Sequence, residues 1–210
     1  MSQLLELHPK NPQVRLVRRA VDSVRSGGVI VYPTDSCYAL GCAIGDKPAM
    51  ERIAHIRQTD QHHHFTLVCR DLSEIARYAR VENWQYRLLK AATPGPYTFI
   101  LEATREVPRR LMNPKRRTIG IRVPDHPVPL LLLAELGEPL MSSTLILPGD
   151  SYPLTDAAEI HARLKHQVAV VLGGGNCGLT PTTVVDLAGK APVVVRLGKG
   201  DPARLGATAG

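Results

Sequence analysis

Aromatic residues are scarce in this 210-residue chain, at 4% of the total. Proteins that bind single-stranded nucleic acids stack bases on aromatic side chains, so this scarcity argues against that class. Long apolar runs are also missing, and the longest one, VPLLLLAEL, is about half of a membrane span. The first residues, MSQLLELHPKNPQ, lack the apolar segment and the cleavage site of a signal peptide. We therefore expect a cytoplasmic protein with no membrane partner.

Cysteine is rare as well. Cys37, Cys42, Cys69 and Cys177 form no CxxC pair and show no Cys–His spacing typical of zinc sites. They are expected to be reduced thiols, as in cytosolic proteins. The three histidines at 62–64 cannot all face one ion from a regular element, and no acidic residue lies at a useful spacing. We expect no protein-bound metal.

Positive charge exceeds negative charge, with 26 Lys and Arg residues against 19 Asp and Glu residues and a formal net charge of +7. Such an excess suits an anionic partner, such as a nucleotide or RNA, although many soluble proteins are mildly basic. The segment VPRRLMNPKRR carries five cations in eleven residues, either as a strip that follows RNA phosphates or as a solvated loop. With so few aromatic residues, double-stranded RNA fits better than single strands. The candidate RNA-binding residues are Arg109, Arg110, Lys115, Arg116 and Arg117.

Helical and strand patterns alternate along the chain. Residues 12–26 and 46–57 have apolar residues at helical spacing, with Asn11 and Asp46 as candidate caps. Short β-branched runs, such as VIVYP, YTFILEA and TIGIRVP, predict buried strands. This interleaving predicts an α/β protein with helices packed on a sheet, and the strand-rich end predicts a mixed sheet. Because no linker, repeat or low-complexity tract interrupts the chain, we expect one domain.

The stretch VYPTDSCYALGC places three oxygen-bearing side chains, Thr34, Asp35 and Ser36, between apolar residues. One interpretation is an ordinary Asx or Ser/Thr turn after a strand. The other is a set of hydroxyl groups that rotate to suit the carboxylate or ammonium group of a ligand. The stretch alone leaves both open.

Six fragments in a fixed order resemble the YrdC/YciO family, whose best-known members are threonylcarbamoyl-AMP synthases. The fragments are VYPTDSCYALGC, TPGPYTFIL, TIGIRVPDHP, LMSSTLILPG, PTTVVDL and VVVRLGKG. The resemblance implies one YrdC-like domain over residues 14–200, with short terminal extensions at 1–13 and 201–210. It also implies a twisted mixed β-sheet with flanking helices around a deep basic cleft.

In the synthases, L-threonine, bicarbonate and ATP give threonylcarbamoyl-adenylate and pyrophosphate, and a partner enzyme uses this product to modify tRNA. The resemblance therefore implies ATP or another nucleotide, L-threonine and bicarbonate as ligands, with Mg²⁺ arriving on ATP. It implies threonine-like substrate contacts at Thr34, Thr66, Arg122, Ser142 and Thr182. It implies nucleotide contacts at Arg57, Thr118, Thr144 and Arg196. No residue is singled out as catalytic. Double-stranded RNA or tRNA remains a further possible partner.

The motifs depart from the synthase pattern at two places, and these departures favour the YciO branch. The Lys-x-Arg motif becomes Arg57-Gln58-Thr59, and the Asn of the STSAN motif becomes Ile146. Each lost hydrogen bond to a charged group is worth about 1.5–3 kcal/mol. The synthase activity is therefore expected to be weak or altered. Two alternatives remain, a double-stranded RNA-binding protein and a nucleotide hydrolase in which water replaces the carbamate.

Overall fold

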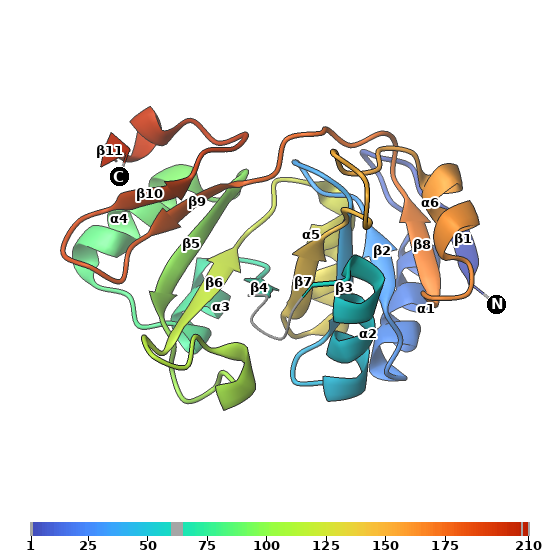
Figure 1. Ribbon diagram of the computed structural model, residues 1–210, viewed down its shortest axis with the longest axis horizontal. Coiled ribbons are helices and arrows are strands. Elements are labelled where there is room, and N and C mark those ends of the chain that lie inside the picture. The colour runs from blue at the N-terminus through green and yellow to red at the C-terminus, as the bar shows by residue number, and fades with distance from the viewer. Residues whose placement is uncertain (1, 60–64, 207, 210) are drawn as a thin grey trace. The chain divides into compact units, whose positions relative to one another are not determined.

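The computed structural model describes residues 2–59, 65–206, 208 and 209. The chain folds into two compact units. Unit 1 comprises Met1–His63 and His126–Thr180, and unit 2 comprises His64–Asp125 and Pro181–Gly210. Each unit has a sheet and helices (Figure 1), as the alternation of helical and strand patterns predicted.

The sheet of unit 1 is mixed. Its strand order is β1-β8-β2-β3-β7. Strand β8 is parallel to β1 and β2, whereas β3 is antiparallel to β2 and β7. The carboxyl ends of β1, β2, β7 and β8 therefore lie at the same edge of this sheet. The strands are β1 (Gln3–Glu6), β2 (Ile30–Tyr32), β3 (Ala39–Ala43), β7 (Leu140–Thr144) and β8 (Val170–Gly173).

Helices cover both faces of this sheet, with α1 and α5 on one face and α2 and α6 on the other (Figure 1). Helices α1 and α5 pack together, and Arg18 Nε lies 2.7 Å from Glu135 Oε2 between them. The bounds are α1 (Val14–Arg25), α2 (Lys47–Arg57), α5 (Pro127–Leu136) and α6 (Ala157–Leu164).

The start of α1 differs from the prediction, because Gln13 and not Asn11 is the N-cap residue. The Asn11 amide donates to His8 Nδ1 at 3.1 Å, and the His8 amide donates to Gln13 Oε1 at 3.2 Å. These bonds close a separate turn before the helix and prevent Asn11 from capping it. Asp46 caps α2 as predicted, accepting a hydrogen bond from the Ala49 amide at 3.0 Å.

The sheet of unit 2 has the strand order β4-β6-β5-β9-β10-β11. The pairs β4/β6, β5/β9 and β10/β11 are parallel, and the pairs β5/β6 and β9/β10 are antiparallel. The strands are β4 (Thr66–Val68), β5 (Tyr97–Glu102), β6 (Thr118–Arg122), β9 (Thr183–Asp186), β10 (Val193–Arg196) and β11 (Thr208–Ala209). The helices are α3 (Leu72–Tyr78), α4 (Asn83–Ala92), and the 3-10 helices η1 (Arg109–Leu111) and η2 (Pro202–Leu205).

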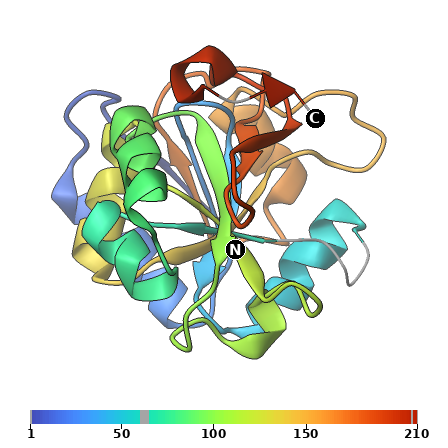
Figure 2. The same cartoon turned by 90° about the vertical axis from the view of Figure 1, so that its left-hand side faces the viewer.

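One face of this second sheet is apolar. Tyr97, Phe99 and Leu101 alternate along β5 and are almost fully buried. Ile119 and Ile121 are their neighbours on β6. Helices α3 and α4 lie together to one side of β5 (Figure 2).

Three strands were not predicted, β1, β3 and the two-residue β11 in the expected extension at 201–210. Strand β1 lies in the expected terminal extension and pairs with β8 at the edge of the sheet. Only one of its four residues, Leu5, is buried, so its sequence gives a weak strand signal. Strand β3 has the sequence ALGCA, whose small residues have low β-propensity. No helix among the described residues has the length and apolarity needed to cross a membrane.

Asp71 provides a test of helix capping. Its carboxylate accepts a hydrogen bond from the Glu74 amide at 2.9 Å. This bond, assisted by Arg70, holds the pKa of Asp71 below its usual value. The stabilisation is therefore present above the unfolded-state pKa of about 3.9 and is lost as the pH falls through the lower folded-state pKa.

We expect Asp71→Ala to lower the free energy of unfolding by about 1 kcal/mol at neutral pH. The difference from the wild type should shrink below about pH 4, measured by urea unfolding at several pH values. Asp22→Ala is the matched control, because Asp22 is exposed on α1 and caps no helix. Equal losses in the two variants, or a loss at Asp71 that does not change with pH, would contradict the capping role.

Candidate functional site

The second face of the unit 2 sheet carries hydroxyl and guanidinium groups. A Cβ atom added at Gly120 would lie 3.4 Å from Thr98 Cγ2 and 3.6 Å from Thr66 Oγ1, so these three residues share a face. Strand alternation adds Thr118 and Arg122 from β6, and the strand register adds Thr182 and Arg196. We call this set the polar face of unit 2: Thr66, Thr98, Thr118, Gly120, Arg122, Thr182 and Arg196.

The polar face is largely shielded from solvent. Thr98, Thr118 and Thr182 are each 6% exposed and Arg122 is 7% exposed. A buried guanidinium group is costly unless anionic or polar groups surround it. Its planar fork suits two-point contact with a carboxylate or phosphate. Hydroxyl groups beside such a fork add donors, so this face is chemically suited to hold an anionic ligand.

Three residues of the polar face are joined by hydrogen bonds. The Oγ1 atoms of Thr98 and Thr182 are 2.9 Å apart. Arg196 Nη2 donates to the Thr182 carbonyl oxygen at 2.9 Å and approaches Thr182 Oγ1 at 3.4 Å. These bonds fix the start of β9 against β5 and β10.

All five predicted ligand contacts that fall in unit 2 lie on this one face. They are Thr66, Thr118, Arg122, Thr182 and Arg196. The sequence separates the first from the last by more than half of the chain, and only the sheet register brings them together. Their binding roles remain predictions. Thr98 was not predicted, although its hydroxyl between Tyr97 and Phe99 was a signal of a polar second face.

In unit 1, Thr34 forms a local turn. Its Oγ1 donates to the Cys37 carbonyl oxygen at 2.7 Å and accepts from the Ser36 and Cys37 amides at 3.1 and 3.2 Å. Thr34 is 4% exposed. The conformation is thus the Ser/Thr turn that was the simpler interpretation of VYPTDSCYALGC. A direct substrate contact through this hydroxyl remains a prediction.

A glycine-rich loop after β8 packs on this turn. A Cβ atom at Gly174 would lie 2.7 Å from Pro33 Cγ, and one at Gly178 would lie 2.9 Å from the Ser36 carbonyl oxygen. Tyr38 Oη donates to the Gly175 carbonyl oxygen at 2.7 Å, and burial raises the pKa of Tyr38 well above its usual value. The turn and the loop follow the carboxyl ends of β2 and β8, where α/β sheets commonly bind ligands.

The remaining predicted contacts of unit 1 are Ser142 and Thr144 on β7 and Arg57 at the end of α2. Ser142 and Thr144 share one face, as predicted from their spacing. Ser142 Oγ is 2.6 Å from Tyr32 Oη and donates to the Leu40 carbonyl oxygen at 3.1 Å, so it serves the core. Arg57 Nη1 donates to Ser143 Oγ, and Ser143 lies on the opposite face. The structure therefore places Arg57 with Ser143 and not with Thr144.

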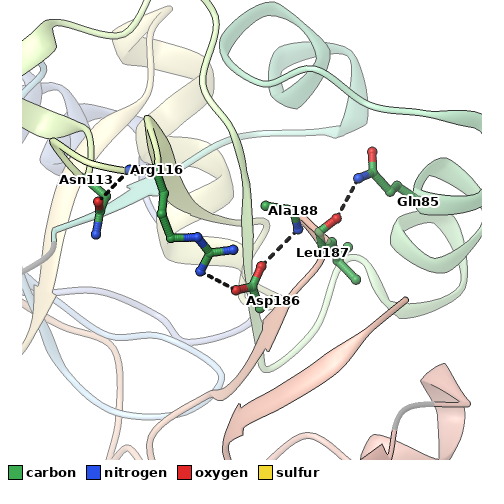
Figure 3. Close-up of polar contacts among 6 residues, drawn as sticks. All are labelled: Gln85, Asn113, Arg116, Asp186, Leu187 and Ala188. Carbon is green, nitrogen blue, oxygen red and sulfur yellow. Dashed lines mark hydrogen bonds and ion pairs between the residues drawn. The ribbon is translucent and has the colours of Figure 1, made fainter. Parts of the chain in front are cut away.

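Arg116 anchors the basic segment of unit 2 (Figure 3). Arg116 Nη1 is 2.6 Å from Asp186 Oδ2, and the Asp186 side chain is only 14% exposed. The hydrogen bond from Arg116 to Asp186 raises the pKa of Arg116. Asn113 Oδ1 accepts from the Arg116 amide at 2.9 Å, and Gln85 Nε2 donates to the Leu187 carbonyl oxygen at 2.7 Å. Arg116 thus ties the segment to the end of β9.

The other four cations of the predicted RNA-binding strip are exposed. They are Arg109, Arg110, Lys115 and Arg117. Arg117 adopts a left-handed backbone conformation with φ of 54°, next to the strand β6.

No group of three or more His, Cys, Asp or Glu residues in the described part of the chain is arranged to hold a metal ion. The three histidines at 62–64 lie outside the described residues. All four cysteines are free thiols, as predicted. Burial raises the pKa of Cys42 to about 12, and Cys69 is shifted in the same direction.

A double-mutant cycle tests whether Ser142 serves the core or a ligand. We expect Ser142→Ala to lower the free energy of unfolding by about 1–2 kcal/mol, because two buried hydrogen bonds are lost. The effect should be non-additive with Tyr32→Phe, since both variants remove the same bond. Ser26→Ala removes an exposed bond to Asp22 and is the control. Unchanged stability of Ser142→Ala with weaker L-threonine binding would instead favour a ligand contact.

Comparisons with known proteins agree with this architecture. A family model described as Sua5_yciO_yrdC, telomere recombination, matches residues 22–198. The Escherichia coli (strain K12) protein YciO is 57% identical over 201 residues, covering 96% of this chain and 98% of YciO. A threonylcarbamoyl-AMP synthase of Chromobacterium violaceum is 33% identical over 180 residues, covering 85% of this chain and 92% of the synthase.

The crystal structure of E. coli YciO superimposes with a TM-score of 0.93 at 56% identity, covering 98% of this chain and 100% of that one. The predicted α/β fold of the YrdC type is therefore confirmed. The chain belongs to the Sua5/YciO/YrdC family, as the order of its six sequence fragments predicted.

Proposed function

We propose that this protein forms an adenylate from L-threonine, bicarbonate and ATP, with a slow or altered rate. In the proposed reaction the amino group of threonine attacks the carbon of bicarbonate, and water leaves. The resulting carbamate oxygen attacks the α-phosphate of ATP. The bond from the α-phosphate to the bridging oxygen breaks, and pyrophosphate leaves. The product, threonylcarbamoyl-adenylate, would serve tRNA modification.

The observation that supports this proposal most strongly is the composition of the polar face of unit 2. Two arginines, Arg122 and Arg196, share this face with the hydroxyls of Thr66, Thr118 and Thr182. Arg122, Thr118 and Thr182 are almost fully buried, whereas Arg196 is exposed. All three ligands of the proposed reaction are anionic or zwitterionic, so each offers oxygen atoms to such donors. The similarity to a named threonylcarbamoyl-AMP synthase supports the choice of substrates.

The proposed roles follow from charge. Arg122 would bind the carboxylate of threonine, with Thr182 lining the same site, while Thr118 and Arg196 would bind the nucleotide. Guanidinium groups near the phosphates would stabilise the charge that develops on the leaving pyrophosphate. Mg²⁺ would enter with ATP and neutralise its phosphates, without dedicated protein ligands.

The lost motif positions limit the proposed rate. Thr59 and Ile146 stand where synthases have Arg and Asn. Thr59 Oγ1 is buried and contacts no hydrogen-bonding group among the described residues. Two missing charged hydrogen bonds would slow adenylate formation roughly a hundredfold to ten-thousandfold.

The direct test incubates the pure protein with ATP, Mg²⁺, threonine and bicarbonate and separates the nucleotides by chromatography. An adduct that depends on threonine supports the synthase. AMP or ADP formed without threonine would instead favour the nucleotide hydrolase. The absence of any nucleotide product would contradict both enzymatic proposals.

Restoring the motif should raise the rate. We expect the double variant Thr59→Arg with Ile146→Asn to form adenylate at least about tenfold faster than the wild type, because one charged hydrogen bond is worth at least that factor. Thr59→Lys with Ile146→Leu is the matched control, which adds a charge but restores no motif. Because both positions are at least half buried, thermal unfolding of each variant must be measured first. A folded double variant with an unchanged rate would contradict the assignment.

RNA binding by the basic segment remains a second proposal, favoured by its five exposed cations, of which Arg116 is paired with Asp186. Each phosphate contact should contribute about −0.7 to −0.9 to the slope of log K against log salt. We expect Lys115→Ala and Arg109→Ala each to flatten this slope by that amount, equally for all duplex RNA sequences. Arg116→Ala is the informative comparison. Because Arg116 is paired with Asp186, it should change the slope less and cost about 0.5 kcal/mol of stability. Unchanged slopes in all three variants would show a solvated loop.

A further inference from the structure

Thr98 and Thr182 hold a donor proton that the described residues do not use. Their Oγ1 atoms are 2.9 Å apart, and both residues are 6% exposed. In such a pair one hydroxyl donates to the other, so one of the two protons is left for a third group. Among the described residues, no acceptor contacts this second proton. Buried donors nearly always have an acceptor, so a ligand atom is the natural partner.

The groups around the pair set the charge of that ligand atom. Arg196 Nη2 lies 3.4 Å from Thr182 Oγ1, on one side of the pair. Phe99 of β5 pairs with Ile121 of β6, so the next position along the antiparallel register sets Thr98 against Arg122. Residues opposed in this way have Cβ atoms about 4.5–5.5 Å apart. With an arginine residue on each side of the pair, an anionic oxygen is the acceptor that suits it best.

The donor direction follows from the same contacts. Arg196 has only N–H groups, so it can only donate to Thr182 Oγ1. If Thr182 then donates to Thr98, each hydroxyl accepts one bond and donates one, an arrangement that strengthens every bond in the chain. The last proton in this chain is that of Thr98, on the side of Arg122. In the opposite direction Thr182 would accept two bonds and Thr98 none.

We propose that Thr98 donates a hydrogen bond to an anionic oxygen of the ligand held by Arg122. Thr182 donates to the Thr98 hydroxyl and Arg196 donates to Thr182, and these two bonds polarise the Thr98 hydroxyl. Thr98 is therefore a ligand-binding residue in addition to those implied by the family resemblance. The proposal rests on the proposed function, in which the anion is the carboxylate of threonine or a phosphate of ATP. Both present the same kind of oxygen, and binding measurements separate them.

The test compares Thr98→Val, Thr98→Ser and Thr182→Val with the wild type by calorimetric titration with L-threonine and, separately, with ATP and Mg²⁺. We expect Thr98→Val to lower the affinity for one of these ligands by about 10- to 100-fold, because a hydrogen bond to a charged group is lost. Thr98→Ser keeps the hydroxyl and should bind within about threefold of the wild type. Thr182→Val should lower the affinity less than Thr98→Val does, because the Thr98 hydroxyl that donates to the ligand remains. A loss confined to L-threonine identifies the carboxylate, and a loss confined to ATP identifies a phosphate.

Thr104→Val is the matched control, because the Thr104 hydroxyl is in unit 2 but bonds the Arg77 carbonyl oxygen away from the sheet. It should leave both affinities unchanged. Valine has nearly the shape of threonine but cannot bond Thr182, so urea unfolding of Thr98→Val should show a lower midpoint than the wild type with the same cooperativity. If Thr98→Val does not fold, Thr98→Ala replaces it in every comparison.

Two results would overturn the inference: unchanged affinity of Thr98→Val for both ligands, or a larger loss in Thr182→Val than in Thr98→Val. The inference about Thr98 and the proposed function can fail separately. Titration of the wild type and of Thr98→Val with acetate and inorganic phosphate distinguishes the two failures. If the wild type forms no adenylate but binds one of these anions through Thr98, the inference stands and the proposed function falls. If the wild type forms adenylate and Thr98→Val forms it with the same KM for threonine and for ATP, the proposed function stands and the inference about Thr98 falls. A wild type that binds none of the four ligands contradicts both.

Discussion

Successive side chains on β5 and β6 point to opposite faces of the sheet of unit 2, and the chemistry of the unit depends on this alternation. Tyr97, Phe99 and Leu101 supply the buried apolar face. The intervening residues of the same strands are then forced onto the other face, where the register sets Thr98 opposite Arg122. The stability of the core and the assembly of the polar groups are thus two results of one register.

Unit 1 uses the ends of strands rather than a face. Its parallel strands bring the turn at Thr34 and the glycine-rich loop after β8 to the same edge. Pro33 and Ser36 approach Gly174 and Gly178 so closely that larger residues would clash. Hydrogen bonds within the turn then occupy the Thr34 hydroxyl. A rigid edge of backbone groups results, which differs in kind from the hydroxyl and guanidinium groups of unit 2.

The sequence predicted the α/β class and most strands and helices, because hydrophobic periodicity and motif order carry that information. The binding roles of the five candidate residues of unit 2 remain predictions. It did not reveal β3, whose small residues give a weak strand signal, or the N-cap at Gln13, which depends on the turn at His8. Arg57 and Arg116 show a different limit. Their partners, Ser143 and Asp186, lie 86 and 70 residues away in sequence, so only the folded chain determines which cations are already engaged.

We propose that the polar face of unit 2 binds the ligand's anionic group. A crystal structure of the protein with L-threonine, bicarbonate and a non-hydrolysable ATP analogue tests this most directly. We predict density for a carboxylate or phosphate within about 3.2 Å of the Arg122 guanidinium group and a threonine hydroxyl of that face. Ligand density found only elsewhere, such as along the basic segment at 109–117, with no ligand atom near Arg122, would contradict it.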